Sequence, residues 1–344
     1  MNLNMAYQPE VLVKTAGLSE SEWLRYRGQG IGGSDAAIVL GLSPYRTARD
    51  LYLEKTGTPV EKDNADWVAM EYGKRLEGLV AEIFAHKTGL RVYQELKMLR
   101  HPLYPFMLAN VDYFVEMPDQ SLAILECKTT GNYGKDRWDD ETVPIHYEIQ
   151  CRHYMSVTNL NMAFIACLYG NNGNDFMFRA IKRDLDYESD IIEQEQYFWE
   201  QCVQARVEPP FTEQGDLVLD SLRRYYRGAD SSAETLSLDN SFSESIEKYL
   251  SLREEKLALD HKSDILEDQM KRIYAPIVEK MGTACRAVCL DGKTQYDITY
   301  NPVCRKVISK DKLIQLELSH PMVYAEYVSS NESRRFSVKK KTAV

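Results

Sequence analysis

Two neighbouring apolar stretches in the first half of the chain carry charged side chains. Asp112 follows Val111 in the first stretch, and Glu126 and Lys128 end the second. Side chains alternate between the two faces of a strand, so Glu126 and Lys128 share one face. A carboxylate and an ammonium at the end of a buried strand are costly to desolvate unless something uses them. Asp112, Glu126 and Lys128 are therefore the candidate catalytic group.

The chemistry that these residue types favour is metal-assisted hydrolysis. Two carboxylates on adjacent strands repel each other, and a cation between them removes that repulsion. Mg²⁺ binds one or two carboxylates and completes its six oxygens with water and substrate phosphate. Such a site activates water and stabilises charge on a phosphodiester. The alternative is a buried ion pair without a catalytic role, and spacing alone leaves both open.

Three further polar residues lie on helices expected on either side of these strands. Glu77 is three residues before Val80 and seven before Phe84, at the edge of an apolar helix face. It could support a cation site or be a solvated glutamate. Gln150 and Tyr154 are four residues apart and share a helix face, where a substrate contact or an ordinary polar stripe would fit.

A glycine-rich segment near the N-terminus resembles a phosphate-binding turn. It reads Arg27-Gly-Gln-Gly-Ile-Gly-Gly-Ser34 and precedes a helix expected over Ala36 to Leu40. Backbone N–H groups at a helix start bind anions, and an arginine and a hydroxyl add donors. It is not a Walker A loop, which needs Gly-Lys-Ser/Thr after four spacer residues. The alternative is a flexible loop with a capping serine.

Hydrophobic periodicity and capping patterns predict the elements that must position these residues. Ser19 and Thr47 begin capping-box patterns. Helices are expected from Ser19 and over 36–40, 47–55, 64–88, 144–157 and 187–206. Strands are expected over 90–98, 106–115, 121–129, 162–169 and 175–182. The order favours an α/β fold of the α+β type, with a mixed central sheet flanked by helices.

The chain is expected to divide into a domain, a linker and an appendage. Residues 1–212 hold the elements described above. Residues 213–240 are rich in Ser, Asp and Gly, which is typical of a linker. Residues 241–344 predict a helical and β-rich appendage, with a charged helix from Ser241 to about Lys280 and a small β-rich tail. We assign it no chemistry.

Composition narrows the class of protein. The net charge of −10 is unusual for a protein that coats nucleic acid, so any DNA-binding surface must be local. No apolar run reaches the roughly 18 residues of a membrane span, and residues 1–17 lack the pattern of a signal peptide. We therefore expect a cytoplasmic protein. The seven cysteines include no CxxC pair, so a zinc ribbon is not expected.

Taken in order, these patterns resemble one family. The pattern W-x-x-x-R-x-x-x-I-G-G-S-D, a helix with Glu77, D…ExK and QxxxY together resemble the lambda-exonuclease and YqaJ-type viral recombinase nucleases of the PD-(D/E)xK superfamily. The most distinctive parts are Ile31-Gly-Gly-Ser34-Asp35-Ala-Ala and Leu42-Ser-Pro-Tyr45. The resemblance covers roughly residues 18–205. The chain lacks the cysteine cluster of iron–sulfur relatives.

The resemblance implies a restriction-endonuclease-like core and a role for each candidate residue. Asp112, Glu126 and the backbone carbonyl of Cys127 would bind Mg²⁺, for which Mn²⁺ would substitute. Lys128 would position or deprotonate the attacking water, and Glu77 would support the metal through water.

The resemblance likewise implies a substrate site and an activity. Arg27, Ser34 and Gln150 would hold a 5′ phosphate, and Tyr154 would join them in contacting DNA. The activity implied is a Mg²⁺-dependent 5′→3′ exonuclease that degrades one strand of duplex DNA and leaves a 3′ overhang for recombination.

The resemblance also implies partners. We expect double-stranded DNA ends, a single-strand annealing protein and a homo-oligomeric ring such as a trimer. No membrane is expected, and the place of action would be the host cytoplasm if a phage encodes the protein. The alternatives are an endonuclease on the same fold and a non-catalytic protein that binds DNA ends.

Overall fold

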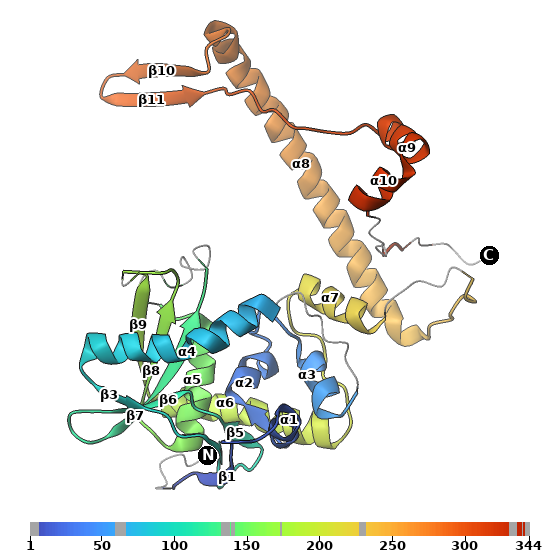
Figure 1. Cartoon of the computed structure of the whole chain (residues 1–344). Coiled ribbons are helices and arrows are strands. Elements are labelled where there is room, and N and C mark those ends of the chain that lie inside the picture. Colours follow the sequence, from blue (N-terminus) through green and yellow to red (C-terminus); the bar gives the residue numbers. More distant parts are fainter. Residues whose placement is uncertain are drawn as a thin grey trace. The chain divides into compact units, whose positions relative to one another are not determined.

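The computed structural model describes most of the chain, in two units. The described residues are 7–58, 67–131, 138, 142–172, 174–226, 232–329, 336–338 and 340. The units are Met1–Arg227 and Gly228–Val344, coloured along the chain in Figure 1. Among the described residues, no helix combines the length and apolar composition that crossing a membrane requires.

Two sheets form the first unit. The central sheet has the order β3-β6-β7-β8-β9, with β3 Arg91–Tyr93, β6 Tyr113–Glu116, β7 Leu122–Thr129, β8 Met162–Leu168 and β9 Phe176–Lys182. Strands β7 and β8 are parallel and the other pairs antiparallel, so the expected mixed sheet is confirmed. The second sheet has the order β1-β4-β5-β2, with β1 Glu10–Lys14, β4 Lys97–Arg100, β5 Met107–Ala109 and β2 Ile31–Gly32.

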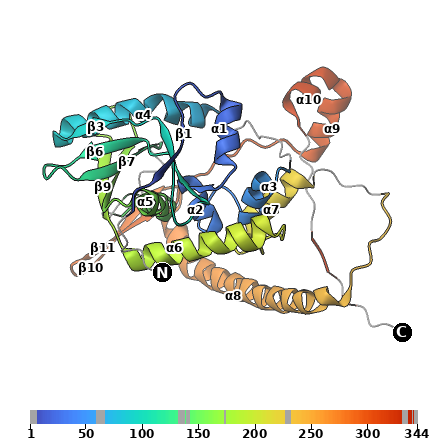
Figure 2. The same ribbon diagram turned by 90° about the horizontal axis from the view of Figure 1, so that it is seen from below.

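Helices cover both faces of the central sheet. The helices of the first unit are α1 Glu20–Arg27, α2 Gly33–Val39, α3 Ala48–Lys55, α4 Trp67–Thr88, α5 Ile145–Thr158, α6 Leu185–Tyr197 and α7 Gly215–Tyr225. Of these, α4 and α5 pack directly on the central sheet. A π-helical turn, Phe198–Gln204, continues α6. Figure 2 shows α4 on one face of the sheet, α5 on the other, and α6 beyond α5. The expected sheet flanked by helices is therefore confirmed.

Local capping explains where the first helices begin. Ser19 accepts from the Glu22 N–H while Glu22 accepts from the Ser19 N–H, and Thr47 and Asp50 do the same before α3. Both expected capping boxes are confirmed. Helix α2 begins at Gly33, earlier than the expected residue 36, because β2 leads directly into it.

Two expected strands are each divided between the sheets. The range 90–98 holds β3 and the start of β4, and the range 106–115 holds β5 and most of β6. Strand β5 pairs with β2 and β4, whereas β6 pairs with β3 and β7, so the chain must leave one sheet and enter the other between Ala109 and Tyr113. Asp112 lies in that crossing.

The apolar face expected on α4 is buried only in its second half. Val80 and Phe84 are fully buried between α4 and the sheet. Val68 and Tyr72, which we expected on the same face, are 59% and 50% exposed. The burial begins only where α4 reaches the central sheet. Residues 64–66 of the expected helix lie outside the described residues.

The structure differs from the linker expected over 213–240. Helix α7 forms within it and packs on α3: the Ser221 hydroxyl donates to Asp50 Oδ1 at 2.7 Å, and Arg224 pairs with Asp50 Oδ2 at 3.0 Å. The boundary between units falls at Arg227 and Gly228 rather than at residue 212. Composition alone missed α7 because its contacts are with a distant helix.

The second unit is a long helix with a hairpin and two short helices. Its elements are α8 Ser243–Met281, β10 Arg286–Asp291, β11 Thr294–Thr299, α9 Lys310–Ser319 and α10 Pro321–Tyr327. The helical and β extension is as expected, although its last elements are helices rather than a β-rich tail. Helix α8, all of whose residues are described, contains no buried residue.

The core of α4 gives a test of the fold. Phe84 is fully buried, and its ring lies 5.2 Å, between centroids, from those of both Phe164 and Phe178. Phe84→Ala should therefore lower the free energy of unfolding by about 3–5 kcal/mol. Val68→Ala, on the exposed half of the same helix, should change it by about 0.5 kcal/mol or less. Denaturant unfolding measures both, and similar effects would contradict the packing described.

Candidate active site

The register of β6 and β7 brings Asp112 and Glu126 side by side. Tyr113 pairs with Leu125, so the residue before β6 lies across from Glu126. The Cys127 N–H donates to Asp112 Oδ2 at 2.9 Å and fixes that carboxylate against β7. Leu125 and Cys127 pack in the cluster under α4, while Glu126 faces Gln150 of α5. The alternation expected along β7 is present.

Glu126 is held through one of its two oxygens. Its side chain is 2% exposed, and Oε1 accepts from Lys128 Nζ at 2.6 Å and from Gln150 Nε2 at 2.5 Å. Lys128 Nζ also donates to Gln150 Oε1 at 3.1 Å, which closes the triangle. Glu126 Oε2 is buried and has no hydrogen-bond partner among the described residues. A buried carboxylate oxygen left in this way is costly unless a cation or donor reaches it.

The pKa values of the neighbouring acids are shifted in the direction expected for a cation site. Burial raises the pKa of Asp112 well above its usual value, and the charge of Glu126 raises it further. Burial and Glu126 likewise raise the pKa of Glu77, which approaches from α4. Burial alone would lower the pKa of Lys128, but the charges of Glu126 and Asp112 raise it. Mutual repulsion of this kind is what a bound divalent cation relieves.

The donor set fits a cation that prefers oxygen. Asp112 and Glu126 would hold it, and the free Glu126 Oε2 supplies one position. No group of three or more His, Cys, Asp or Glu side chains that could share one ion occurs in the described part of the chain. Two carboxylates with water and phosphate suit Mg²⁺ or Mn²⁺ rather than zinc. The Cys127 carbonyl as a third ligand stays a prediction.

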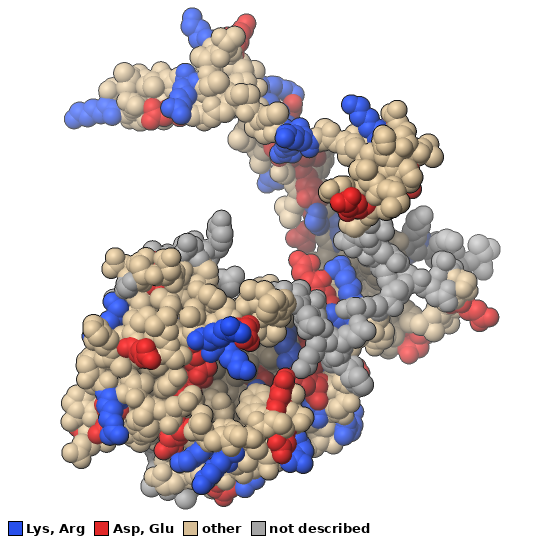
Figure 3. Space-filling model, viewed as in Figure 1, with Lys and Arg blue, Asp and Glu red and all other residues tan. Residues whose placement is uncertain are grey.

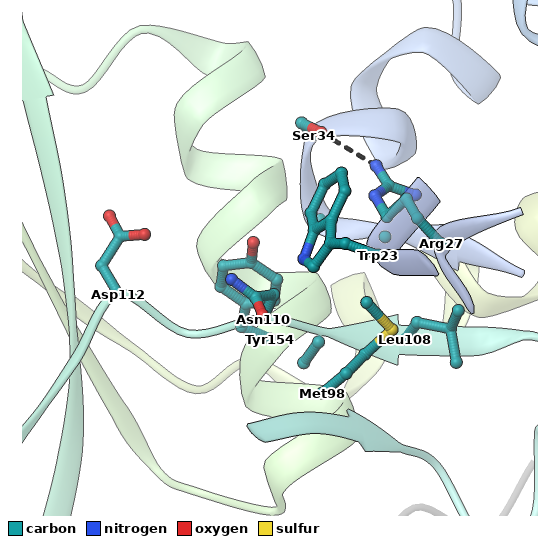
Figure 4. A pocket seen from close by; sticks show the side chains of 11 residues that line it. Trp23, Arg27, Ser34, Met98, Leu108, Asn110, Asp112 and Tyr154 are labelled. Carbon is teal, nitrogen blue, oxygen red and sulfur yellow. Dashed lines mark hydrogen bonds between the residues drawn. The ribbon is translucent and has the colours of Figure 1, made fainter. Parts of the chain in front are cut away.

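A pocket of about 140 Å³ joins Asp112 to the glycine-rich segment. Its lining comprises Trp23, Arg27, Gly32, Gly33, Ser34, Met98, Leu108, Ala109, Asn110, Asp112 and Tyr154. In Figure 4, Asp112 lies at one side of the pocket, Arg27 and Ser34 lie at the other, and Asn110 and Tyr154 lie between them. The pocket therefore extends from one carboxylate of the expected catalytic group to the expected phosphate-binding segment.

Arg27 contacts Ser34 and is held in place by Asp35 and Lys55, to which the sequence assigned no role. It forms an ion pair with Asp35, and its second terminal nitrogen donates to the Ser34 hydroxyl at 3.1 Å. Lys55, whose side chain is fully buried, pairs with Asp35 at 3.1 Å and donates to the Arg27 carbonyl at 3.0 Å. Burial alone would raise the pKa of Asp35, but the charges of Arg27 and Lys55 lower it. Two cations share one carboxylate, which leaves this end of the pocket positive.

Close packing holds the glycine-rich segment in place. A Cβ on Gly32 would lie 2.7 Å from Arg27 Cζ, and one on Gly33 would lie 2.5 Å from Tyr154 Cε1. Ile31 is fully buried and pairs with Met107 of β5. The flexible loop considered as an alternative is therefore not what forms here.

The other expected substrate residues lie beside the carboxylates or in the pocket wall. Gln150 does not line the pocket and instead bonds Glu126 and Lys128. Tyr154 lines the pocket, and its hydroxyl lies 3.4 Å from Gln150 Nε2. Their contacts with a phosphate stay predictions, and Gln150 is placed to position Glu126.

Two of the residues missed from the sequence left different signals. Asp35 stands at the third position of α2 and accepts from the Gly32 N–H at 3.2 Å, so a capping pattern could have found it. Lys55 lies at the end of α3 and reaches Arg27 only through the tertiary fold. No local pattern marks it.

The surface around the first unit agrees with a local rather than a broad anion site. On the face shown in Figure 3, Lys and Arg are interspersed with Asp and Glu. With a net charge of −10, positive potential must come from particular pockets. The pocket lined by Arg27 is one such place.

Comparison with known proteins gives one family and one relative along nearly the whole chain. A model of the YqaJ-like viral recombinase domain matches residues 22–161. The chain is 33% identical over 333 residues to the uncharacterized protein YqaJ of Bacillus subtilis (strain 168), covering 96% of this chain and 97% of that protein. The expected resemblance to YqaJ-type proteins is therefore confirmed.

Two solved structures are similar to part of the chain. The alkaline exonuclease LHK-Exo of Laribacter hongkongensis has a TM-score of 0.47 and 18% identity, covering 59% of this chain and 98% of its own. A phage-related exonuclease of Haemophilus somnus 129PT has a TM-score of 0.40 and 14% identity, covering 52% and 96%.

The carboxylate geometry predicts cation binding that depends on both acids. Asp112→Asn and Glu126→Gln should each weaken Mn²⁺ binding by more than the roughly 10- to 100-fold lost with an outer-shell partner. Isothermal titration calorimetry measures this directly. Glu116→Gln, an acid at the far end of β6, is the matched control and should bind as the unmodified protein does. Equal Mn²⁺ affinity in all four proteins would place the cation elsewhere.

Proposed function

Because the chain belongs to the YqaJ-like viral recombinase family, we propose that it is a Mg²⁺-dependent 5′→3′ exonuclease of double-stranded DNA. Its product would be duplex with a 3′ single-stranded overhang, the substrate that recombination needs. One observation carries the proposal: Asp112, one of the two carboxylates suited to a cation, lines the same pocket as an arginine–serine pair suited to a phosphate.

Each candidate site residue has its own role in the proposed hydrolysis. A divalent cation held by Asp112 and Glu126 would polarise the scissile phosphodiester and activate water. Lys128, held by Glu126 and Gln150, positions the attacking water with its ammonium hydrogens. Glu77 adds a third negative charge that strengthens the attraction for the cation. Gln150 hydrogen-bonds both Glu126 and Lys128 and so fixes their positions relative to each other.

The other side of the pocket accounts for a preference for ends. A terminal phosphate carries more negative charge than an internal diester, and Arg27 offers it a planar, bidentate donor. The Ser34 hydroxyl already contacts Arg27 and completes the donor set. Asp35 fixes the Arg27 side chain and Lys55 fixes the Arg27 backbone carbonyl before substrate arrives, which reduces the entropy lost on binding.

The proposal includes the partners expected from the resemblance. These are double-stranded DNA ends, a single-strand annealing protein, and further copies of this chain in a ring. Action in the host cytoplasm belongs to the same proposal.

Closed circular DNA separates the proposed exonuclease from an endonuclease on the same fold. The exonuclease should leave closed circles intact and degrade the same DNA after linearisation. Removal of the divalent cation by EDTA should stop degradation of the DNA. A non-catalytic protein that binds DNA ends would not degrade the DNA even without EDTA.

Lys128 is expected to act on the chemical step. Lys128→Ala should lower kcat by about 10²- to 10⁴-fold, the usual effect of removing a positioned acid–base group, with Mn²⁺ affinity nearly unchanged. Single-turnover cleavage of linear duplex measures the rate. Lys182→Ala, at an exposed position on β9, serves as the control. A variant that loses only DNA affinity would instead make Lys128 a simple phosphate contact.

Arg27 is expected to recognise the 5′ end. Linear duplex with a 5′ phosphate should be degraded faster than the same duplex with a 5′ hydroxyl, by roughly 10- to 100-fold if a charge-assisted contact is lost. Arg27→Ala should erase most of this preference, and Asp35 would keep its partner Lys55. Arg25→Ala, on the exposed side of the same helix, should leave the preference for a 5′ phosphate unchanged. An Arg27→Ala protein that still discriminates fully between the two ends would refute the assignment.

A further inference from the structure

The segment from Leu42 to Tyr45 has no role in the proposed reaction, yet it is built to present one aromatic ring. Ser43 is buried, and its hydroxyl accepts from the N–H of Tyr45 at 3.2 Å and of Arg46 at 3.4 Å. This local bonding fixes the turn. Tyr45 itself is 59% exposed. A fixed backbone that carries a mostly exposed tyrosine is suited to contact something outside the protein.

The Tyr45 ring is supported from α5. It meets the His146 ring edge-on, with centroids 5.7 Å apart. Burial raises the pKa of Tyr147 to about 12, and the hydrogen bond with the Tyr45 side chain contributes to that rise. Lys128 Nζ lies 5.0 Å from the centre of the Tyr147 ring. Contacts therefore run from Tyr45 through Tyr147 to the candidate catalytic lysine.

Helix α5 gives the order of these groups across the site. Tyr154 lines the phosphate pocket, Gln150 bonds Glu126, and Tyr147 lies against Lys128. At a rise of 1.5 Å per residue, Gln150 is about 6 Å and Tyr147 about 10 Å along the helix from Tyr154. A strand whose 5′ phosphate lies in the pocket, and whose next phosphate lies at the carboxylates, continues toward Tyr147 and Tyr45.

We propose that Tyr45 is a substrate-binding residue whose exposed ring stacks on the second nucleotide of the degraded strand, on the 3′ side of the scissile bond. This inference rests on the proposed exonuclease function. Stacking on an aromatic ring accepts any base, because every base has a flat π-face. It therefore suits an enzyme that must cut at each successive nucleotide whatever the sequence.

Substitutions at Tyr45 separate stacking from a merely structural role. Tyr45→Ala should lower kcat/KM for the first cleavage by about 5- to 100-fold, the range measured for loss of one base–aromatic stack. Tyr45→Phe keeps the ring but loses the hydrogen bond to Tyr147, and should stay near the unmodified rate. Tyr197→Ala is the matched control, because Tyr197 is equally exposed, at 59%, and lies on α6, which carries none of the candidate site residues.

An altered substrate tests the stack from the DNA side. A duplex with a single abasic residue at the second nucleotide should slow the unmodified protein by about the factor seen for Tyr45→Ala. The Tyr45→Ala protein should not be slowed further by the abasic residue, because the two changes remove the same contact.

Three results would contradict the inference. It is overturned if the unmodified protein is indifferent to the abasic residue, if Tyr45→Phe loses as much as Tyr45→Ala, or if Tyr45→Ala cleaves normally. Failure of the unmodified protein to degrade linear duplex with Mg²⁺ or Mn²⁺ would instead reject the proposed function.

Discussion

The buried carboxylate of Glu126 is the interaction on which the site depends. Lys128 and Gln150 both donate to its Oε1, so a single oxygen fixes both side chains. Oε2 is left buried without a partner in the described residues, and Asp112 is held next to it by the backbone of Cys127. The Glu126 charge is paired with Lys128, but a buried carboxylate oxygen without a hydrogen-bond partner still costs roughly 1–3 kcal/mol. A cation bound at Oε2 would remove that cost, which favours the proposed metal site over a purely structural ion pair.

The phosphate side of the pocket depends on elements far apart in the chain. Asp35 of α2 joins Arg27 of α1 to Lys55 of α3, so three helices meet at one carboxylate. Helix α3 is in turn fastened by Asp50 to α7, which lies beyond the region that the sequence marks as the catalytic domain. Support for Arg27 thus extends from the N-terminal helices to the last helix of the first unit.

Sequence reasoning worked where structure is local and failed where it is not. Alternation along β7 predicted that Glu126 and Lys128 share a face, and capping patterns predicted the starts of α1 and α3. The four-stranded sheet was not predicted, because it pairs short strands from distant parts of the chain. Lys55 was missed for the same reason: only the packing of α3 brings it to Arg27. Periodicity also overestimated the buried part of α4, since a helix pattern does not say how far the sheet beneath it extends.

The packed glycines near Arg27 also have a consequence for genetics. Every missense change in a glycine codon adds at least one carbon, and at Gly30 that carbon would lie 2.2 Å from the Phe106 carbonyl oxygen. Gly32 and Gly33 are closed in by side chains instead: a Cβ would lie 2.7 Å from Arg27 Cζ and 2.5 Å from Tyr154 Cε1. In a library of random point mutants, the codon of Gly30 would therefore tolerate replacement least of the three, whereas the codon of Gly215, with open space around it, would accept replacements.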